Sequence, residues 1–327
     1  MKTRALGREG LTVSAIGLGC MGMSQGYGPT DEAESIATLQ LAVEVGVTFW
    51  DTAQSYGAGH NERLLAKALE GHRDQVTLAT KFGIVRDATG VHLDARPERA
   101  KSDCEASLER LGTDHLDLYY LHRVDPAVPL EETMGAMAAL VAQGKVRYIG
   151  ISECTASQLE QAATVHPLSA LQVEWSLWWR EPEDDLVPTA RRLGIGIVAF
   201  SPLGRGFLAG GVDPASLDMN DFRRRDARFQ GTDLAANTAV AEQVRLIAAE
   251  RGITPAQMAL AWLSAQGDDV VPIPGTKRSS RLEENAAAAE VDLSASDRER
   301  LEAVAPREAW AGARDAFAAP RTNRSGA

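Results

Sequence analysis

Short apolar runs alternate along this chain with longer segments in which apolar residues recur at helical spacing. The runs are almost entirely apolar instead of alternating between apolar and polar, which favours parallel strands that are buried on both faces. We predict eight such strands: Val13–Leu18, Val47–Trp50, Val76–Thr80, Leu116–Leu121, Val146–Ile151, Ala170–Val173, Ile195–Phe200 and Val270–Ile273.

Helix signals stand between the strands. Asp31, with Glu34 three residues later, predicts the start of one helix, and Gly112 predicts the end of another. A strand followed by a helix, repeated eight times, is typical of an α/β fold of the (β/α)8 TIM barrel type. The predicted helices are Glu32–Val45, Glu62–Leu69, Glu98–Leu111, Leu130–Gln143, Ala156–Val165, Asp184–Leu193, Asn237–Arg251 and Ser279–Ala288.

Some segments lie outside this repeat. Lys2–Val13 predicts an N-terminal hairpin, and Pro202–Ala236 a long insertion after the seventh strand. Thr254–Ser264 predicts an additional helix, and Ser294–Val304 an extra C-terminal helix that starts with a capping box.

We expect a single domain over residues 1–327, with residues 306–327 as a flexible tail. The alternative is an open, doubly wound sheet. That arrangement would need a domain boundary near the middle of the chain, and no linker rich in proline, glycine or serine marks one.

Composition narrows the class of protein. Of the 327 residues 44% are hydrophobic, and no apolar run approaches the roughly 20 residues that cross a membrane. The formal net charge of −11 argues against a nucleic-acid partner. The three cysteines lie far apart, and the first residues lack the apolar stretch of a signal peptide. We therefore expect a cytoplasmic protein without a membrane partner; the sequence does not indicate its oligomeric state.

Polar residues follow several predicted strands directly. Asp51, Lys81, His122 and Ser152 each come immediately after an apolar run, and Tyr56 follows in the loop after Asp51. The active sites of TIM barrels lie at the carboxyl ends of the strands, so we expect these side chains to converge.

This set suits proton transfer. The ordinary pKa of a tyrosine is about 10, and we expect the ammonium of Lys81, held by Asp51, to lower the pKa of Tyr56. His122 would orient a carbonyl oxygen next to the tyrosine hydroxyl. Such a site protonates an oxygen while hydride reaches the carbon. Because side chains cannot supply hydride, a nicotinamide cofactor is implied.

Several motifs resemble those of the aldo-keto reductase family, in the family's order and from about Leu6 to about Val304. Within the family, the chain looks most like the bacterial and plant branch that has Phe before Ser-Pro-Leu-Gly. The motifs are FWDTAQSYG (49–57), GHNE (59–62), ATK (79–81), DLYYLH (117–122), GKVRYIGIS (144–152), FSPLG (200–204) and IPGTK (273–277).

The resemblance implies reduction of a small-molecule carbonyl substrate with NADPH, converted to NADP+, and a catalytic tetrad of Asp51, Tyr56, Lys81 and His122. No paired histidine spacing predicts a metal site. The cofactor contacts that the resemblance implies are the carboxamide ligands Ser152 and Gln172, the stacking ring Phe200, the pyrophosphate loop with Ser201, Pro202, Leu203, Gly204 and Gly206, the 2′-phosphate ligands Lys277 and Arg281, the adenine ligand Asn285, and in addition Met21, Gly275, Thr276 and Glu284.

Two other interpretations stay open. Gly17, Gly19 and Gly22 match the glycine pattern of dinucleotide-binding folds, but no helix is predicted to begin at Gly22, so we expect close backbone packing instead. The tetrad also occurs in proteins of this fold that serve as cofactor-sensing subunits with little turnover. The sequence indicates neither the physiological substrate nor the preferred direction of reaction.

The sequence allows two interpretations for some other residues. Glu153 follows Ser152 and either faces the cofactor or caps the next helix. Trp178 and Trp179 either cover an apolar substrate or belong to a packed loop. Residues Arg223–Arg225 are expected on a solvated loop face, with a phosphate clamp as the alternative. Cys20 and Cys154 are expected to be small apolar filler near the rim.

Overall fold

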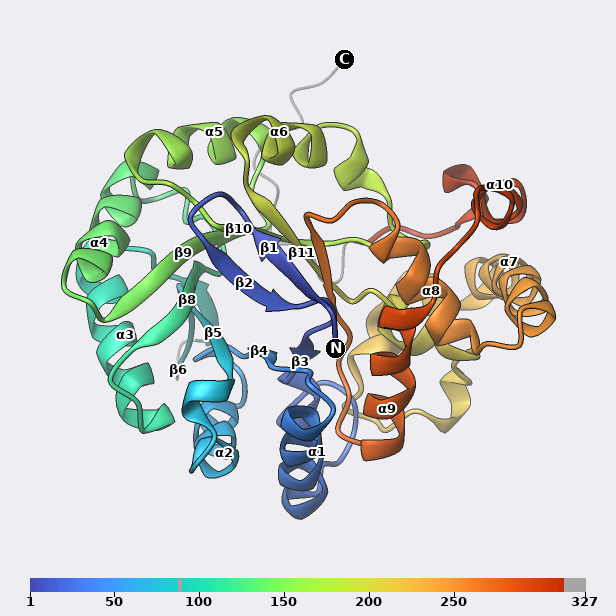
Figure 1. The fold of residues 1–327 in the computed structure, drawn as a ribbon, viewed down its shortest axis with the longest axis horizontal. Helices are drawn as coiled ribbons and strands as arrows, with labels where there is room; N and C mark the ends of the chain where they lie inside the picture. Colours follow the sequence, from blue (N-terminus) through green and yellow to red (C-terminus); the bar gives the residue numbers. More distant parts are fainter. Residues whose placement is uncertain (88–89, 315–327) are drawn as a thin grey trace.

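The computed structural model describes residues 1–87 and 90–314 and contains a parallel sheet of eight strands (Figure 1). A bridge between Gly19 and Gly275, with a hydrogen bond of 2.9 Å from Gly17 N to Pro272 O, joins the first strand to the last. The predicted TIM barrel is confirmed. Its strands are β3 (Leu18–Gly19), β4 (Phe49–Asp51), β5 (Thr77–Phe82), β8 (Leu116–Leu121), β9 (Val146–Ser152), β10 (Ala170–Glu174), β11 (Gly196–Phe200) and β12 (Val270–Ile273).

Helices surround the strands, and α7 and α10 lie at the outer right of the view in Figure 1. The predicted caps are present: Asp31 accepts the Glu34 N–H at 2.8 Å, and Gly112 has a φ of 64°. The helices are α1 (Glu32–Glu44), α2 (His60–Leu69), α3 (Pro97–Leu111), α4 (Leu130–Ala142), α5 (Ala156–Val165), α6 (Leu186–Leu193), α7 (Gly231–Glu250), α8 (Pro255–Ser264), α9 (Ser279–Ala287) and α10 (Ala295–Val304).

Short 3-10 helices fill the connections, four of them within the insertion after β11. They are η1 (Met21–Met23), η2 (Arg73–Gln75), η3 (Glu181–Glu183), η4 (Gly204–Ala209), η5 (Pro214–Ser216), η6 (Phe222–Arg225), η7 (Ala227–Phe229), η8 (Ala288–Glu290) and η9 (Arg307–Ala309).

The predicted N-terminal hairpin closes the amino end of the barrel. Its strands β1 (Thr3–Leu6) and β2 (Leu11–Ser14) pair antiparallel and cross in front of the barrel in Figure 1. Leu6 and Leu11 pack into one buried cluster with interior side chains such as Phe49. The hairpin therefore fills the barrel at the amino ends of its strands, and the opposite end is left open for a functional site.

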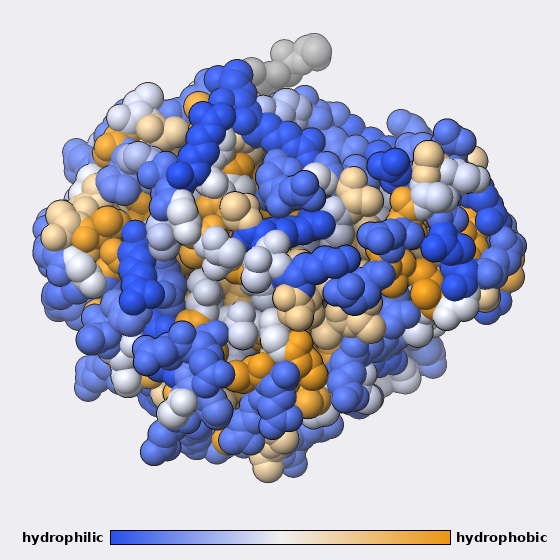
Figure 2. Space-filling view, viewed as in Figure 1, coloured by the Kyte–Doolittle hydropathy of each residue, from blue (hydrophilic) through white to orange (hydrophobic). Residues whose placement is uncertain are grey.

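A second and larger apolar cluster lies between the strands and the surrounding helices, and includes Trp50, Leu116 and Trp262. The face in Figure 2 is mainly hydrophilic, with hydrophobic residues in small separate groups. Within the described ranges, no helix combines the length and the apolar character needed to cross a membrane.

Two element predictions were wrong in part, and one hairpin was not predicted. Val13 belongs to β2, so the run Val13–Leu18 is divided between the hairpin and the two-residue strand β3. Both parts are buried, and the apolar pattern alone does not separate them. The helix after the insertion begins at Gly231, earlier than predicted. The hairpin of β6 (Ile84–Asp87) and β7 (Gly90–Leu93) was not predicted.

Residues 306–314 pack against the barrel, unlike a flexible tail. Asn237 makes two hydrogen bonds with the Ala311 backbone, of 2.8 and 3.0 Å. Arg314 is only 4% exposed. The rest of the predicted tail, residues 315–327, lies outside the described residues.

Candidate active site

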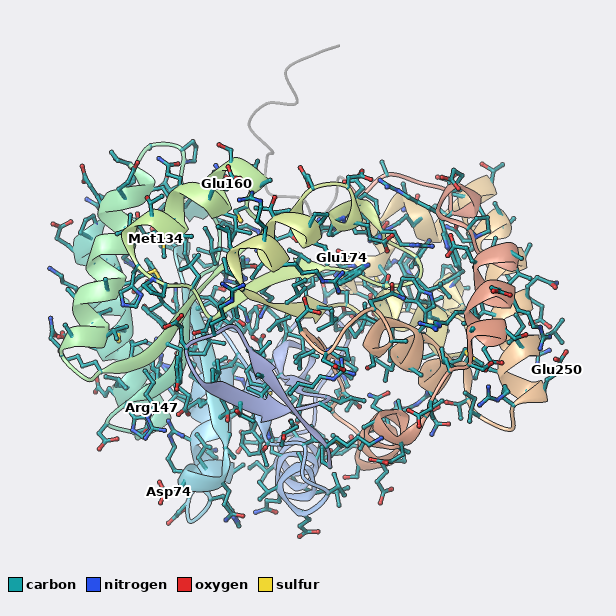
Figure 3. The ribbon with its side chains drawn as sticks, turned by 45° about the horizontal axis from the view of Figure 1, so that its top comes forward. Asp74, Met134, Arg147, Glu160, Glu174 and Glu250 are labelled. Carbon is teal, nitrogen blue, oxygen red and sulfur yellow. The ribbon has the colours of Figure 1, made fainter. Side chains whose placement is uncertain are left out.

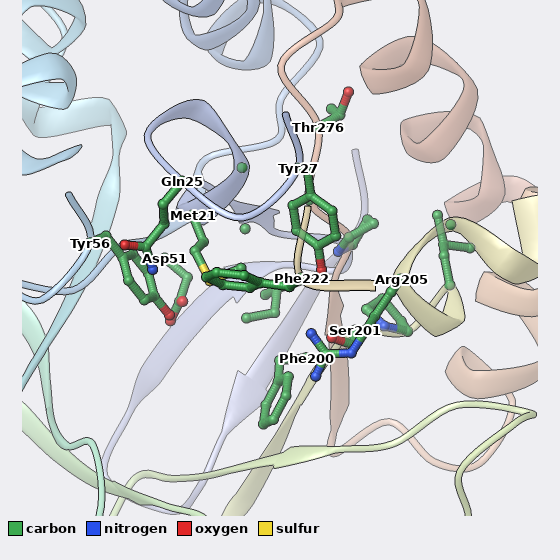
Figure 4. A pocket seen from close by; sticks show the side chains of 18 of the residues that line it. Met21, Gln25, Tyr27, Asp51, Tyr56, Phe200, Ser201, Arg205, Phe222 and Thr276 are labelled. Atoms are coloured by element: carbon green, nitrogen blue, oxygen red, sulfur yellow. The ribbon is translucent and has the colours of Figure 1, made fainter. Parts of the chain in front are cut away.

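A cavity of about 510 Å³ opens at the carboxyl ends of the strands. Figure 4 shows Asp51 and Tyr56 at one end of it, Arg205 and Thr276 towards the other, and Phe222 between them. Most of the predicted site residues line this single cavity: Met21, Asp51, Tyr56, His122, Ser152, Gln172, Phe200, Ser201, Pro202, Leu203, Gly206, Gly275, Thr276, Lys277, Arg281 and Asn285.

Three predicted residues stand outside the lining. Lys81 is fully buried behind Asp51. Gly204 packs against the ring of Trp178, which would come within 2.4 Å of a Cβ atom at this position. Glu284 turns to Arg281, with a nitrogen to oxygen distance of 3.2 Å.

Backbone strain gathers at this end of the barrel. In the described part of the chain, the non-glycine residues with positive φ are Ala58, Glu153, Ser201 and Arg205. Each lies in a connection that follows a barrel strand, Arg205 within the 3-10 helix η4. Left-handed backbone at non-glycine residues costs free energy and is concentrated at functional sites.

Lys81 and Asp51 form a buried ion pair with supporting hydrogen bonds. The Nζ of Lys81 donates to Asp51 Oδ1, and to the Thr52 carbonyl at 2.8 Å. The second carboxylate oxygen, Oδ2, accepts from Gln172 Nε2 at 2.7 Å. Burial opposes the charge on Lys81, but Asp51 and Tyr56 outweigh it and raise the lysine's pKa. The lysine therefore stays a cation.

The hydroxyl of Tyr56 lies 3.5 Å from that ammonium. Lys81 acts to lower the tyrosine's pKa, as expected, but burial is the larger effect and the net pKa of Tyr56 is raised. The expectation of a lowered pKa was therefore wrong in its net direction. The phenol is protonated at neutral pH, the form in which it can donate a proton.

His122 packs edge-on to Tyr56, with ring centroids 5.8 Å apart. Burial, together with the charges of Arg123 and Lys81, holds the pKa of His122 well below its usual range. The Nδ1 atom is buried and has no hydrogen-bond partner among the described residues. The neutral tautomer with hydrogen on Nε2 therefore costs less, because it leaves no buried N–H unpaired.

At the other end, Lys277 holds a loop. Its Nζ donates to the carbonyl of Tyr27 at 3.1 Å and to that of Pro29. The N–H of Phe222, in the insertion, donates to Gly26 O of the same loop at 3.0 Å. Segments after β3, β11 and β12 thus meet over the middle of the cavity.

Five arginines of the lining did not appear among the predicted site residues. Three of them stand next to predicted site residues: Arg123 follows His122, Arg205 lies between Gly204 and Gly206, and Arg278 follows Lys277. Arg86 lies in the hairpin that was not predicted. Seven lining side chains are cationic and one, Asp51, is acidic, within the described ranges. The five are Arg86, Arg123, Arg205, Arg223 and Arg278.

Arg223 corrects the expectation of a solvated loop face. It lines the cavity, pairs with Asp221 at 2.7 Å and lies 5.2 Å from the centroid of the Tyr27 ring. Arg224 and Arg225 are exposed, as expected for such a face. A run of like residues in a 3-10 helix points in different directions, so its members need not share one environment.

The helix-cap interpretation of Glu153 was wrong, and the structure gives no support to the cofactor-facing one. The next helix is capped by Thr155, in a capping box with Gln158, and Glu153 is absent from the cavity wall. Its carboxylate instead accepts the N–H of Glu174 at 3.1 Å and pairs with Arg314 at 2.8 Å. The residue ties two strand ends to the C-terminal segment.

Glu174 is the centre of a buried ionic cluster and lies well inside the molecule in Figure 3, unlike Glu160 and Glu250 at its edge. Burial opposes its charge, but the guanidinium groups of Arg314, Arg205 and Arg228, at 2.6, 3.3 and 3.1 Å, lower its pKa to about 2. Through Arg205 the cluster reaches the cavity wall.

Trp178 belongs to a packed loop and does not line the cavity. Its ring stacks on Phe207 with centroids 4.6 Å apart, and Arg228 lies 4.7 Å from its centroid. Trp179 is also absent from the cavity wall. Cys20 and Cys154 are buried, as expected for filler.

The glycine pattern near the N-terminus lies at the seam of the barrel. A Cβ atom on Gly17 would come within 2.8 Å of Phe49, and one on Gly19 within 2.9 Å of Ile273 O. Gly22 lies in the short helix η1, with no α-helix starting there. The expectation of close packing is confirmed.

No group of three or more His, Cys, Asp or Glu side chains is arranged to hold a metal ion in the described part of the chain.

Comparison with known proteins identifies the family. The model of the aldo/keto reductase family matches residues 15–306. "Probable aldo-keto reductase 1" of Glycine max is 45% identical over 303 residues, 91% of this chain and 88% of that protein.

Two solved structures share the fold. A glycerol dehydrogenase from Gluconobacter oxydans is 25% identical, with a TM-score of 0.85 over 92% of this chain and 94% of its own. An aldo/keto reductase from Klebsiella pneumoniae in complex with NADP and acetate is 31% identical, with a TM-score of 0.74 over 94% of this chain and 96% of its own. One cavity brings together Asp51, Tyr56 and His122 in front of Lys81. On the evidence of the family match and of the relative from Glycine max, the chain belongs to the aldo/keto reductase family.

Proposed function

We propose that this protein is an NADPH-dependent reductase that converts aldehydes or ketones to alcohols, with Tyr56 as the general acid. The observation that carries the proposal is the position of the protonated Tyr56 hydroxyl. It lines the cavity and lies 3.5 Å from a lysine ammonium that is itself fixed by Asp51.

The lining suits a phosphorylated dinucleotide. Gln172 uses its amide N–H on Asp51, which leaves its carbonyl oxygen to accept from a carboxamide. The aromatic ring of Phe200 also lines the cavity. At the other end Lys277 and Arg281 supply donors that suit a 2′-phosphate. The Klebsiella relative, solved with NADP, supports this assignment.

When bound, the nicotinamide supplies hydride to the carbonyl carbon. The Tyr56 hydroxyl gives its proton to the carbonyl oxygen as negative charge grows there. Lys81 stabilises the phenolate that this leaves, and Asp51 keeps the ammonium in place. Neutral His122, with its N–H on Nε2, donates a hydrogen bond to the same oxygen and so orients the substrate.

Tyr56→Phe tests the general acid, because it removes the proton donor and keeps the ring. We expect the oxidation of NADPH by a simple aldehyde, followed by absorbance, to fall about 10²- to 10⁴-fold. The dissociation constant of NADPH, from quenching of tryptophan fluorescence, should change little.

Tyr148→Phe is the matched control. Tyr148 lies on β9, and its hydroxyl is near Gly10 of the N-terminal hairpin, at the closed end of the barrel. This variant should keep wild-type turnover. Substantial turnover by Tyr56→Phe would exclude the assigned role. Tight NADPH binding without turnover by the wild type would favour the cofactor-sensing alternative.

A further inference from the structure

Two arginines at the catalytic end of the cavity have no role in the proposed reaction so far. Arg123 directly follows His122, and Arg86 lies on β6 of the small hairpin. Both line the cavity. Burial and the charges of Arg123, Lys81 and Arg86 lower the pKa of His122, so both guanidinium groups act on the catalytic imidazole.

Arg123 is held in place by neutral groups. Its Nη1 donates to the carbonyl of His122 at 2.6 Å and to Ser152 Oγ at 3.3 Å. In residues 1–87 and 90–314, no carboxylate forms an ion pair with Arg123 or with Arg86. Arg123 is partly buried, and burial lowers its pKa.

Two described carboxylates, Glu153 next to Ser152 and Asp51 in the cavity wall, are engaged elsewhere. Glu153 pairs with Arg314 at 2.8 Å and accepts the N–H of Glu174. Asp51 uses both oxygens on Lys81 and Gln172. A partly buried cation without a counterion is costly, and an anion that enters the cavity would relieve that cost.

Other cationic residues, at the opposite end of the cavity, would bind the phosphates of the proposed cofactor. Lys277, Arg278 and Arg281 follow β12, whereas Arg123 and Arg86 follow β8 and β5 beside the tetrad. A guanidinium presents a planar fork of donors, which matches the two oxygens of a carboxylate.

We propose that the physiological substrate is an aldehyde or ketone that also carries a carboxylate, bound by Arg123 while Arg86 attracts it at the cavity mouth. This inference rests on the proposed reductase function and adds the class of substrate. The anion does not take part in the chemical step; it holds the carbonyl oxygen in reach of Tyr56.

The test compares 4-formylbenzoate with its methyl ester, which has the same aldehyde and lacks the charge. Wild-type kcat/KM should favour the acid by about tenfold or more. Arg123→Gln should lower kcat/KM for the acid about 10- to 100-fold and for the ester by less than about 3-fold. Arg225→Gln removes an exposed charge outside the cavity wall and should leave the ratio unchanged.

Arg86→Gln is a second variant at an exposed position, where a failure to fold is not at issue. It should lower the acid preference roughly 2- to 5-fold, as expected for a solvated charge. NADPH binding by tryptophan fluorescence shows that each variant is folded.

Equal losses for acid and ester in Arg123→Gln, with weaker NADPH binding, would assign Arg123 to the cofactor and overturn the inference. If the wild type turns over both substrates without preferring the acid, the inference about the substrate is overturned and the proposed reductase function stands. Absence of turnover with both substrates would overturn the proposed function and this inference with it.

Discussion

Asp51 has no free carboxylate oxygen, because one binds Lys81 and the other binds Gln172. The lysine is therefore fixed next to Tyr56 before any ligand enters. Charges placed in advance need no rearrangement when negative charge develops, and this is the main way in which a polar site lowers a reaction barrier. Gln172 links this pair to the part of the wall where the nicotinamide is proposed to lie.

Lys277→Ala tests the choice between the two nicotinamide cofactors. Loss of one charge-assisted contact to the 2′-phosphate should weaken NADPH binding by about 1.5 to 3 kcal/mol, whereas NADH binding should hardly change. Titration of tryptophan fluorescence with each cofactor measures this. Lys101→Ala, an exposed lysine on α3, is the control. Equal losses for both cofactors would mean that Lys277 acts by holding the loop at Tyr27 and not on the phosphate.

For single residues, the sequence predicts which side chains follow the strands. It does not predict contacts between residues that are far apart in the sequence. Asp51 and His122 could be predicted because each directly follows an apolar run. The partner of Glu153 could not, because Arg314 lies in a segment predicted to be a flexible tail. The net pKa of Tyr56 depends on burial, which no spacing of residues gives.

The elements divide the barrel into a packed end and an open end. The β1–β2 hairpin fills one end with Leu6 and Leu11, and strained loops with Ser201 and Arg205 form the other. Substitutions between them, in the strands, should therefore affect stability first.

Gly150→Ala in β9 should destabilise the fold by about 1 to 3 kcal/mol, because the new methyl group overpacks the interior. Its Cβ would lie 2.6 Å from Ala170 O and 2.6 Å from the Tyr120 ring. Gly135→Ala in α4 meets no atom within 4 Å and should stabilise by about 0.4 to 1 kcal/mol. Urea unfolding of both variants checks the opposite signs. Two changes of the same sign would contradict this account.

Long elements with caps were predicted well, and short ones were not. Helix α3 ends at Gly112 as its sequence indicates. Strand β3 has two residues, too few for any periodicity. The β6–β7 hairpin carried a sequence signal in Asp87 and Gly90, and recognising it would have brought Arg86 into view.

On the scale of the whole molecule, the cluster at Glu174 joins distant parts of the chain. Strand β10, the insertion and the C-terminal segment each contribute a charge through Glu174, Arg228 and Arg314. Removing one member leaves the others without compensation, so the cluster couples residues 306–314 to the fold as a whole.

Arg314→Met should lower the free energy of unfolding at pH 7 by about 3 kcal/mol. The pKa of Glu174 is about 2 when folded against a usual 4.5, so its contribution is full above pH 4.5 and is lost as the pH falls towards 2. The difference between wild type and variant should therefore narrow below pH 4.5 in urea titrations. Arg307→Met is the control. It breaks a solvated ion pair with Asp184 and should lower the free energy of unfolding by less than about 1 kcal/mol.

The crowding of cations in one cavity has a kinetic consequence for a protein whose formal net charge is −11. An anion that approaches from solution first meets the repulsive field of the whole surface, and only near the mouth does it meet the attraction of Arg86 and Arg123. Salt at 0.1 M screens fields beyond about 10 Å, so it weakens the distant repulsion before the local attraction. We therefore expect moderate ionic strength to speed the binding of anionic ligands, and higher ionic strength to speed their dissociation.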